Sequence, residues 1–359
     1  MSFFFRKQKY HSLLTEESLN VILHDINEDQ QFHPTIHLTT EKNFIKEIKA
    51  SVQLHNRNNL TRTAAYLKFY EQHPEIQWSF LAHMVSRNAG YHMTDLKSVT
   101  THMLLSEKET KGLFLFLEKA NYEIFSDAYV QLLLYEKSLQ LDRPLFHLLN
   151  AFHVSPFMKK MWSMFWKEKQ KKVLTVAMII NEQQMLQTRV LTAEENRNWL
   201  QKTILTLHDK LNLTTILFPY QRKKHAPYDL TGLDVHQFAN VDHRILTGKS
   251  LYSLLFHPKI HNSALQFASK TPHTASRKDY WPHIYKNQVE AHSVHSPPLK
   301  EAWQNVTTLP LQKKEWYSAN LITKMTYWFA LQQKTPKNKS NSQRKIAKWQ
   351  KALQTTFLR

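Results

Sequence analysis

Apolar residues along this chain recur mainly at the three- and four-residue spacing of a helix. That spacing predicts helices at about 15–26 and 40–55. A third helix, in NNLTRTAAYLKFYEQHP, is expected to end before Pro74, because the residue before a proline disfavours helical backbone. The next helix is expected over about 75–89 and should end at Gly90, since glycine readily adopts the left-handed conformation that closes a helix.

Three local signals mark further helix starts, namely two capping boxes and one serine before a proline at the first helical position. They are Ser106 with Glu109, Thr192 with Glu195, and Ser155 before Pro156. The two capped segments are expected to end near Asn121 and Asn212. Together with the periodicity, these signals predict roughly a dozen helices.

Strand character is confined to TTILFPY at 214–220, and a single strand cannot form a sheet. Two long segments, 219–233 and 271–298, lack periodicity but contain enough aromatic residues to predict packed loops. KTPKNKSNSQRK at 334–345 predicts a polar linker before a final helix. The predicted fold class is therefore all-α: an irregular multi-helix bundle with long loops and a basic C-terminal helix.

Glycine is scarce, with only four residues in 359, and no two are close together. This excludes the glycine-rich loops that cradle phosphates in dinucleotide-binding and P-loop proteins. It also favours helices over a large sheet, whose turns often need glycine. We expect N-terminal helices in 1–55, a main helical domain over 56–333, and the polar linker with a basic amphipathic helix over 334–359.

Cysteine is absent, which excludes a disulfide framework and cysteine-ligated zinc. The longest apolar run, at 173–180, is far shorter than the roughly 20 residues that span a bilayer, and no signal-peptide core is present. These observations predict a soluble, cytoplasmic chain. Neither an HExxH helix nor a GxSxG elbow occurs. Three close histidine pairs, His33 and His37, His257 and His261, and His292 and His295, lack a carboxylate companion at helical spacing, so no metal and no cofactor is expected.

Polar side chains line up on one face of an otherwise apolar helix in SFLAHMVSRNAGYHMTDL at 79–96. At 100° per residue, Ser79, His83, Ser86 and Arg87 share a narrow arc. A solvent-facing stripe in so charged a chain would normally carry several lysines and glutamates, yet this one holds a single charge. The arc is therefore expected to face other protein or a ligand.

Other helices repeat this feature: Arg62 and Tyr66 share a face of the preceding helix, while Glu182 and Arg244 lie among apolar residues of later segments. An unpaired ion in an apolar interior costs several kcal/mol. We therefore expect one interior polar cluster with more positive than negative groups. Its predicted members are Arg62, Tyr66, His83, Arg87, Asn88, Asp95, Asn181, Glu182 and Arg244.

An excess of positive charge in such a cluster suits a phosphate or carboxylate ligand. The alternative interpretation is a fully satisfied network that fixes the register of the helices, because structural ion networks have the same electrostatics as sites. A further alternative is an enzyme in which His83 or Glu182 transfers a proton and the arginines clamp an anion.

The segment TRTAAYLKFYEQHPEIQWSFLAHMVSRNAGYHMTDL, together with INEQ, GKSLYSLLF and HTASRKDYWP, resembles the YppC-like family. This is a domain of unknown function found in Bacillus and related Firmicutes. The resemblance covers about 56–283, and HMVSRNAGYHMTDL is its most distinctive part. It implies a Gram-positive bacterial cytoplasm and brings no activity, cofactor or catalytic residue.

The chain is strongly basic, with a net charge of +19 and a pI near 9.7, which predicts a polyanionic partner such as nucleic acid or an anionic membrane surface. No acidic residue follows Glu315. The last helix carries candidate polyanion-binding residues Lys345, Lys348, Trp349 and Lys351, with Ile346, Trp349, Leu353 and Phe357 predicted on its apolar side. Docking onto the chain's own domain is the alternative for this helix.

A second basic run, KKMWSMFWKEKQKK at 159–172, places aromatic residues between lysines, which is one way of stacking nucleic-acid bases. Packing of those aromatics into the core is the favoured interpretation. For the whole chain, the leading hypothesis is a protein that binds an anionic partner, nucleic acid or a phosphorylated ligand, through its basic surface and the interior cluster. An enzyme acting on a small anion, and a peripheral membrane protein, are the alternatives.

Overall fold

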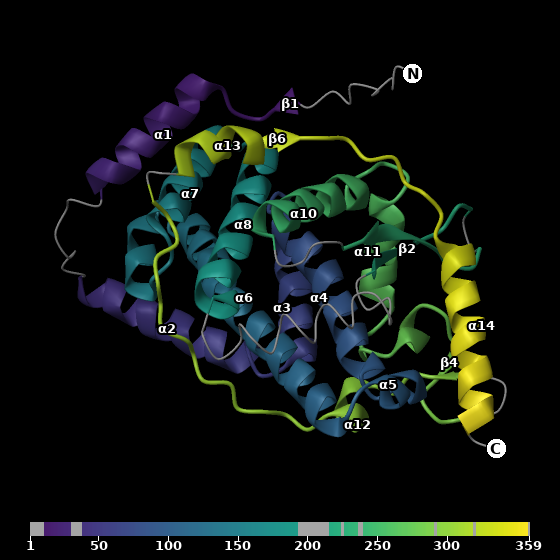
Figure 1. Ribbon diagram of the computed structural model, residues 1–359. Helices are drawn as coiled ribbons and strands as arrows, with labels where there is room; N and C mark the ends of the chain where they lie inside the picture. The colour runs from purple at the N-terminus through teal and green to yellow at the C-terminus, as the bar shows by residue number, and fades with distance from the viewer. Residues whose placement is uncertain are drawn as a thin grey trace.

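Helices dominate the computed structural model, which describes residues 11–29, 38–192, 215–223, 226–235, 240–290, 293–318 and 321–357. The α-helices are α1 (Glu16–Asp29), α2 (Thr39–His55), α3 (Asn59–Gln72), α4 (Gln77–Asp95), α5 (Val99–Leu104), α6 (Glu107–Gln140), α7 (Pro156–Glu168), α8 (Lys171–Leu186), α10 (Val241–Leu255), α11 (His261–Lys270), α12 (Leu299–Ala302), α13 (Ile322–Trp328) and α14 (Ser340–Phe357) (Figure 1). Helical turns of other geometry are η1 (Phe146–Phe152), η2 (Gln187–Leu191) and η3 (Arg277–Asp279). The predicted all-α class is confirmed.

Six short strands form three two-stranded pairs in the described part of the chain. The pairs are β1 (His11–Ser12) with β6 (Ala330–Leu331), β2 (Thr215–Tyr220) with β3 (Asp229–Asp234), and β4 (Tyr285–Lys286) with β5 (Val294–His295). The prediction of a lone strand at 214–220 is therefore wrong, because β3 supplies an antiparallel partner from a segment predicted as a loop. The sequence signal for strand β3 was weak, because DLTGLD has only three apolar positions, one of which is the glycine.

The apolar run at 173–180 forms half of α8, which lies at the centre of the bundle (Figure 1). A helix that is apolar all round has to be buried on every side. Helices α4, α6, α7 and α10 pack around it, and Val176, Ala177 and Ile180 have no exposed surface. One continuous apolar core extends from Leu14 to Ala347.

Helices α3 and α4 pack against each other, as the short connection at Pro74 predicts. The prediction that α4 ends at Gly90 is wrong, because the helix continues to Asp95. Gly90 has no positive φ. A Cβ at this position would lie 2.4 Å from Asn59 Oδ1 and 2.8 Å from His273 Nε2. Glycine is needed here for close packing, not for a turn.

The capping box at Ser106 is confirmed, since Ser106 N donates to Glu109 Oε2 at 2.8 Å and Glu109 N donates to Ser106 Oγ. The helix that it opens runs to Gln140, however, and not to about Asn121. Asn121 stays helical because no proline or glycine follows it, and its side chain donates to a backbone carbonyl one turn earlier. The helix start at Ser155–Pro156 is confirmed. The segment predicted from the Thr192–Glu195 box lies outside the described residues.

The final helix α14 docks onto α5, β3 and β5 (Figure 1). It begins at Ser340, inside the predicted linker, where Ser340 Oγ accepts from Leu230 N and donates to Asp229 Oδ1, both at 2.9 Å. Its buried face carries Gln343, Ala347 and Gln354. The expected apolar side is therefore not the docking side, and Trp349 is 49% exposed.

The aromatic residues of the basic run at 159–172 lie mostly in the core, as the favoured interpretation held. Met161, Trp162 and Phe165 of α7 are buried, so they are closed to bases of a nucleic acid. Within the described residues, every helix is too short or too polar to cross a membrane.

Candidate functional site

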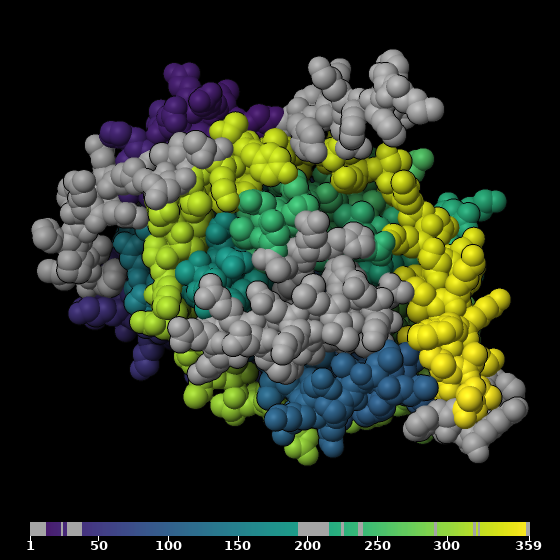
Figure 2. Space-filling view, in the orientation of Figure 1, coloured from purple at the N-terminus to yellow at the C-terminus, as the bar shows by residue number. Residues whose placement is uncertain are grey.

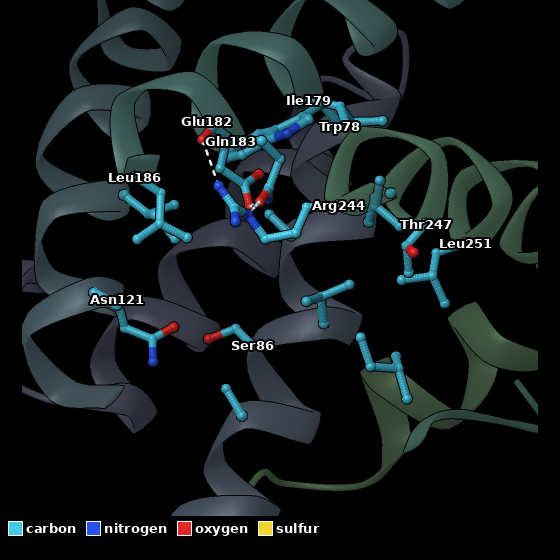
Figure 3. A pocket seen from close by; sticks show the side chains of 18 of the residues that line it. Trp78, Ser86, Asn121, Ile179, Glu182, Gln183, Leu186, Arg244, Thr247 and Leu251 are labelled. Carbon is cyan, nitrogen blue, oxygen red and sulfur yellow. Dashed lines mark hydrogen bonds between the residues drawn. The ribbon is translucent and has the colours of Figure 1, made fainter. Parts of the chain in front are cut away.

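A cavity of about 220 Å³ lies between α3, α4, α6, α8 and α10. Most of the described residues that line it are apolar, and they include Leu81, Val85, Ile124, Ile179 and Leu251. The charged residues among them are two arginines and one glutamate, Arg62, Arg244 and Glu182. Figure 3 shows Glu182, Gln183 and Arg244 grouped on one side of the cavity. The arrangement is a mostly apolar chamber whose lining contains two arginines and one glutamate.

Arg62 reaches the cavity from the first turn of α3, which is fixed by Asn58 accepting from Thr61 N. Its Nη2 donates to Glu118 Oε2 of α6 at 2.6 Å, and its Nη1 donates to Asn56 Oδ1 at 3.1 Å. Both charged side chains are almost completely buried, at 1% and 3% exposure. Arg62 Nε has no hydrogen-bond acceptor among the described residues.

Arg244 reaches the cavity from the first turn of α10, which begins after Asn240 caps it by accepting from His243 N. Its Nε donates to Gln183 Oε1 at 3.0 Å, and its Nη2 donates to Gln187 Oε1 at 2.8 Å. Burial lowers the pKa of Arg244 to about 10, while the nearby Glu182 carboxylate opposes that change. Arg244 is therefore charged at neutral pH.

Glu182 is the half-buried acid of the cavity, on α8. Burial raises its pKa to about 7, although hydrogen bonds and the charge of Arg244 act in the opposite direction. Gln183 Nε2 donates to Glu182 Oε1 at 2.9 Å. Burial also raises the pKa of Tyr66, and there Glu182 adds to the rise while Arg62 opposes it. At neutral pH, the Glu182 side chain is thus protonated in part of the molecules and ionised in the rest.

This raised pKa predicts that Glu182 makes stability depend on pH. Because the folded pKa of about 7 exceeds the ordinary value of 4.5, the contribution is fully present below pH 4.5 and is lost as pH rises through 7. Glu182→Gln, which mimics the protonated form, should match the parent protein at pH 5 and be more stable by about 1–3 kcal/mol at pH 8. Urea unfolding of both proteins at the two pH values measures this difference. Equal stability at pH 8 would contradict it.

The predicted single cluster is divided in the structure, because Arg87 and Asp95 each have another partner. Arg87 Nη2 lies 3.5 Å from Asp279 Oδ2, and its Nη1 donates to Thr271 O at 2.8 Å. Asp95 accepts three hydrogen bonds from Arg277, between 2.6 and 2.9 Å. Both partners belong to the 271–298 segment, which packs against α4. Neither Arg87 nor Asp95 lines the cavity.

Two other predicted members, His83 and Asn88, also lie outside the cavity. His83 Nδ1 bonds Thr63 O at 2.8 Å, and burial followed by the charge of Arg87 lowers the pKa of His83 well below its ordinary value. Asn88 exchanges two hydrogen bonds with the backbone of Leu217 and so joins α4 to β2. Such contacts are typical of the alternative interpretation, in which a satisfied polar network fixes the register of the helices. Neither His83 nor Asn88 lines the cavity.

Asn181 belongs to a second buried network around Asp127 of α6. Asp127 Oδ2 accepts from Asn181 Nδ2 at 2.7 Å and from Gln131 Nε2 at 2.8 Å. Trp316 Nε1 donates to Asn181 Oδ1 at 2.8 Å, and Arg189 Nη1 lies 3.5 Å from Asp127 Oδ1. This network joins α6, α8, η2 and the 303–318 segment.

Of the nine predicted residues, the cavity therefore contains Arg62, Tyr66, Glu182 and Arg244. Sequence reasoning missed Glu118, the partner of Arg62, although this residue lies inside the helix predicted from Ser106 to about Asn121. The available signal was a lone acid on a helical face, four residues after Phe114 and seven before Phe125. Both phenylalanines are buried.

A second, more open cavity of about 630 Å³ lies between α2, α6, η1 and the 305–313 segment. Its described lining has no carboxylate and includes Lys49, Arg57, His153 and Lys313. Lys313 Nζ lies 3.6 Å from Glu123 Oε2, so part of this positive charge is neutralised. No sequence pattern indicated this cavity, because its residues come from distant segments.

Histidine pairs do not gather into a metal centre in the described residues, where no three metal-ligating side chains meet. His261 Nε2 bonds the hydroxyl of Tyr70 at 3.0 Å, and His257 Nδ1 accepts from Lys259 N. His33, His37 and His292 lie outside the described residues.

The candidate polyanion-binding residues lie on α14. Lys345, Lys348 and Trp349 are exposed, and Lys351 is half-buried. The preceding Arg344 guanidinium lies over the Trp281 ring, 5.6 Å from its centroid.

Comparison with known proteins confirms the resemblance. The family described as "Protein of unknown function (DUF2515)" matches residues 54–351. The chain is 37% identical over 282 residues to "Uncharacterized protein YppC" of Bacillus subtilis (strain 168), and the match covers 78% of this chain and 85% of that relative. No solved structure matches the chain.

Proposed function

This chain belongs to the DUF2515 family, proteins of unknown function, and we propose that it binds a small amphiphilic anion in the cavity between α3 and α10. The observation that carries the proposal is the cavity lining. The lining is mostly apolar but contains two arginines and Glu182, and burial raises the pKa of Glu182. Pockets of this kind hold the apolar body of a ligand and orient it with a few polar groups.

Charge favours an anion as the ligand. Glu118 pairs with Arg62, whereas Glu182, the acid beside Arg244, is only partly ionised at neutral pH. Both guanidinium groups lie in a mostly apolar chamber, where hydrogen bonds from a guanidinium to an oxyanion are stronger than in water. A carboxylate or phosphate on an apolar chain satisfies both features of the lining.

Octanoate is a suitable probe, with octanol as the uncharged control. In calorimetric titration at pH 7, the parent protein should bind octanoate more tightly than octanol. Arg244→Gln should weaken octanoate binding at least about ten-fold, since a hydrogen bond to a charged group contributes about 1.5–3 kcal/mol. Arg222→Gln removes an arginine whose side chain is 68% exposed and which pairs with Asp229 outside the cavity. That variant should bind like the parent. Equal affinity for octanoate and octanol would count against an anion site.

A second candidate function is proton transfer to a small anionic substrate, and the pKa of Glu182 supports it. General acids and bases work best when their pKa lies near the working pH. Glu182 fits this requirement and lines the cavity beside Arg244. In this function, Glu182→Gln would abolish turnover while leaving octanoate binding intact, whereas a pure binding protein would show no substrate consumption in either form.

We also propose the cytoplasm as the compartment of this protein. The absence of cysteine from the sequence, and therefore of any disulfide, supports it. Cell fractionation with antibody detection tests the location.

A further inference from the structure

Exposed apolar side chains and lysines share a surface formed by α14 and α5. We call this the α5–α14 surface and define it by Met103, Leu104, Lys345, Lys348 and Trp349. The three apolar side chains are 51%, 43% and 49% exposed, respectively for Met103, Leu104 and Trp349. The two helices pack against each other, and Figure 2 shows them side by side on one face, α14 in yellow and the α5 region in blue.

The docking of α14 accounts for the exposure of Trp349. Ala347 is buried, and Trp349 follows it by two residues, which turns its side chain about 200° around the helix. Lys345 lies one turn before Trp349 on the same face, and Lys348 flanks it. The buried face of α14 fixes this orientation, because Gln354 Oε1 accepts a hydrogen bond from His295 N and Gln354 Nε2 donates one to Glu290 O. The tryptophan is thus held outside the fold.

Positive charge on this surface is largely unopposed. No acidic residue follows Glu315 in the sequence. In the part of the chain that the structure describes, Lys345 and Lys348 have no carboxylate partner. Glu107 and Glu109 follow α5 at the start of α6, and neither of these two described acids forms an ion pair with Lys345 or Lys348.

We propose that the α5–α14 surface docks onto an anionic lipid membrane. Lysines are attracted to anionic headgroups, tryptophan is favoured at the membrane–water interface, and exposed Met and Leu side chains gain by burial among acyl chains. Nucleic acid would use the lysines and one stacked ring, but it offers little to aliphatic side chains. The combination of Met103 and Leu104 with Trp349 therefore favours lipid.

Flotation of the full chain with vesicles tests this surface. The protein should float with phosphatidylcholine–phosphatidylglycerol vesicles at low salt and stay behind with pure phosphatidylcholine. Lys345→Gln with Lys348→Gln should lower the partition coefficient roughly thirty-fold, because each lysine near such a surface contributes about a five-fold effect. Trp349→Ser should lower it several-fold. These positions are exposed, so the variants should keep the parent's unfolding midpoint.

Lys171→Gln with Lys172→Gln is the matched control, because it removes the same charge from two exposed lysines at the start of α8. Retained flotation of this control would support the proposal. An equal loss in both double variants would overturn it, since net charge alone would then explain binding. Failure of the parent to float would also overturn it, as would retention of single-stranded DNA, lost in Lys345→Gln with Lys348→Gln, without vesicle binding.

Discussion

Replacing Arg62 by methionine is expected to lower the free energy of unfolding by about 3–5 kcal/mol. Methionine fills much of the space of arginine but leaves the Glu118 carboxylate buried without its partner. Glu118 Oε1 already has no hydrogen-bond donor among the described residues, and its Oε2 depends on Arg62 Nη2. Asn56 Oδ1 would lose the other Arg62 hydrogen bond. Urea unfolding followed by circular dichroism measures the change.

The double variant Arg62→Met with Glu118→Met should recover most of that loss, because a buried ion pair replaced by apolar residues is often close to neutral in stability. Arg222→Gln is the control for removing an arginine whose own side chain is exposed. It should cost less than Arg62→Met, because Asp229 keeps its hydrogen bond from Ser340 Oγ. A loss below 1 kcal/mol in Arg62→Met would mean that water reaches Glu118. The cavity would then be wetter than its apolar lining indicates.

The ion pair between Arg62 and Glu118 also explains why Arg244 is a better residue than Arg62 for testing ligand binding. Arg62 supports the junction of α3 and α6 through Glu118, so its replacement is expected to weaken the fold and the site together. The hydrogen-bond acceptors that Arg244 would leave behind on Gln183 and Gln187 are neutral. The nearby Glu182, whose pKa is about 7, can take up a proton when the guanidinium is removed. Removing a partner from a neutral acceptor costs less than stranding an ion.

The helical character of the chain and many helix starts could be predicted from the sequence, because the interactions that cause them are local. The box at Ser106 and Glu109 acts within one turn, and the proline after Ser155 acts at the next residue. The end of α4 could not be predicted in this way. Gly90 looked like a cap, but its role depends on Asn59 and His273, which come from distant parts of the chain.

The residues of the candidate site show the same difference between local and long-range causes. The rule that charges on apolar faces must find partners applies to Arg62, Arg87 and Asp95 alike. The rule does not say which partner each one finds. Glu118, Asp279 and Arg277 are brought in by long-range packing, and two of them lie in a segment predicted only as a loop.

The orientation of α14 shows a further limit. Periodicity placed Ile346, Trp349, Leu353 and Phe357 on one side, and apolar sides usually dock. In the structure, hydrogen bonds of Gln354 and the small Ala347 determine the docked face instead. Specific polar contacts of this kind leave no periodic signal in the sequence.

Gly90→Ala is expected to lower the free energy of unfolding by about 2–4 kcal/mol. A Cβ at this position would meet Asn59 Oδ1 at 2.4 Å, His273 Nε2 at 2.8 Å and Ala275 Cβ at 2.9 Å. Overpacking of this kind typically costs about 1–3 kcal/mol. The substitution also pushes apart the hydrogen bond between His273 Nε2 and Asn59 Oδ1, which is 2.8 Å long. A buried acceptor left unpaired costs a further 1–3 kcal/mol or so.

The intrinsic helix preference acts in the other direction, since alanine stabilises a helix interior by about 1 kcal/mol relative to glycine. Packing should outweigh it here, because Asn59 cannot move away freely: its Nδ2 also donates to Ser86 O at 2.8 Å. Gly248→Ala is the matched control, because a Cβ there meets only the Ile179 side chain, at 2.7 Å from Cγ2. Urea unfolding should rank Gly90→Ala well below Gly248→Ala in stability. If Gly90→Ala were instead as stable as the parent, the close junction of α3, α4 and the 271–275 segment would be wrong, and with it the separation of Arg87 from the cavity.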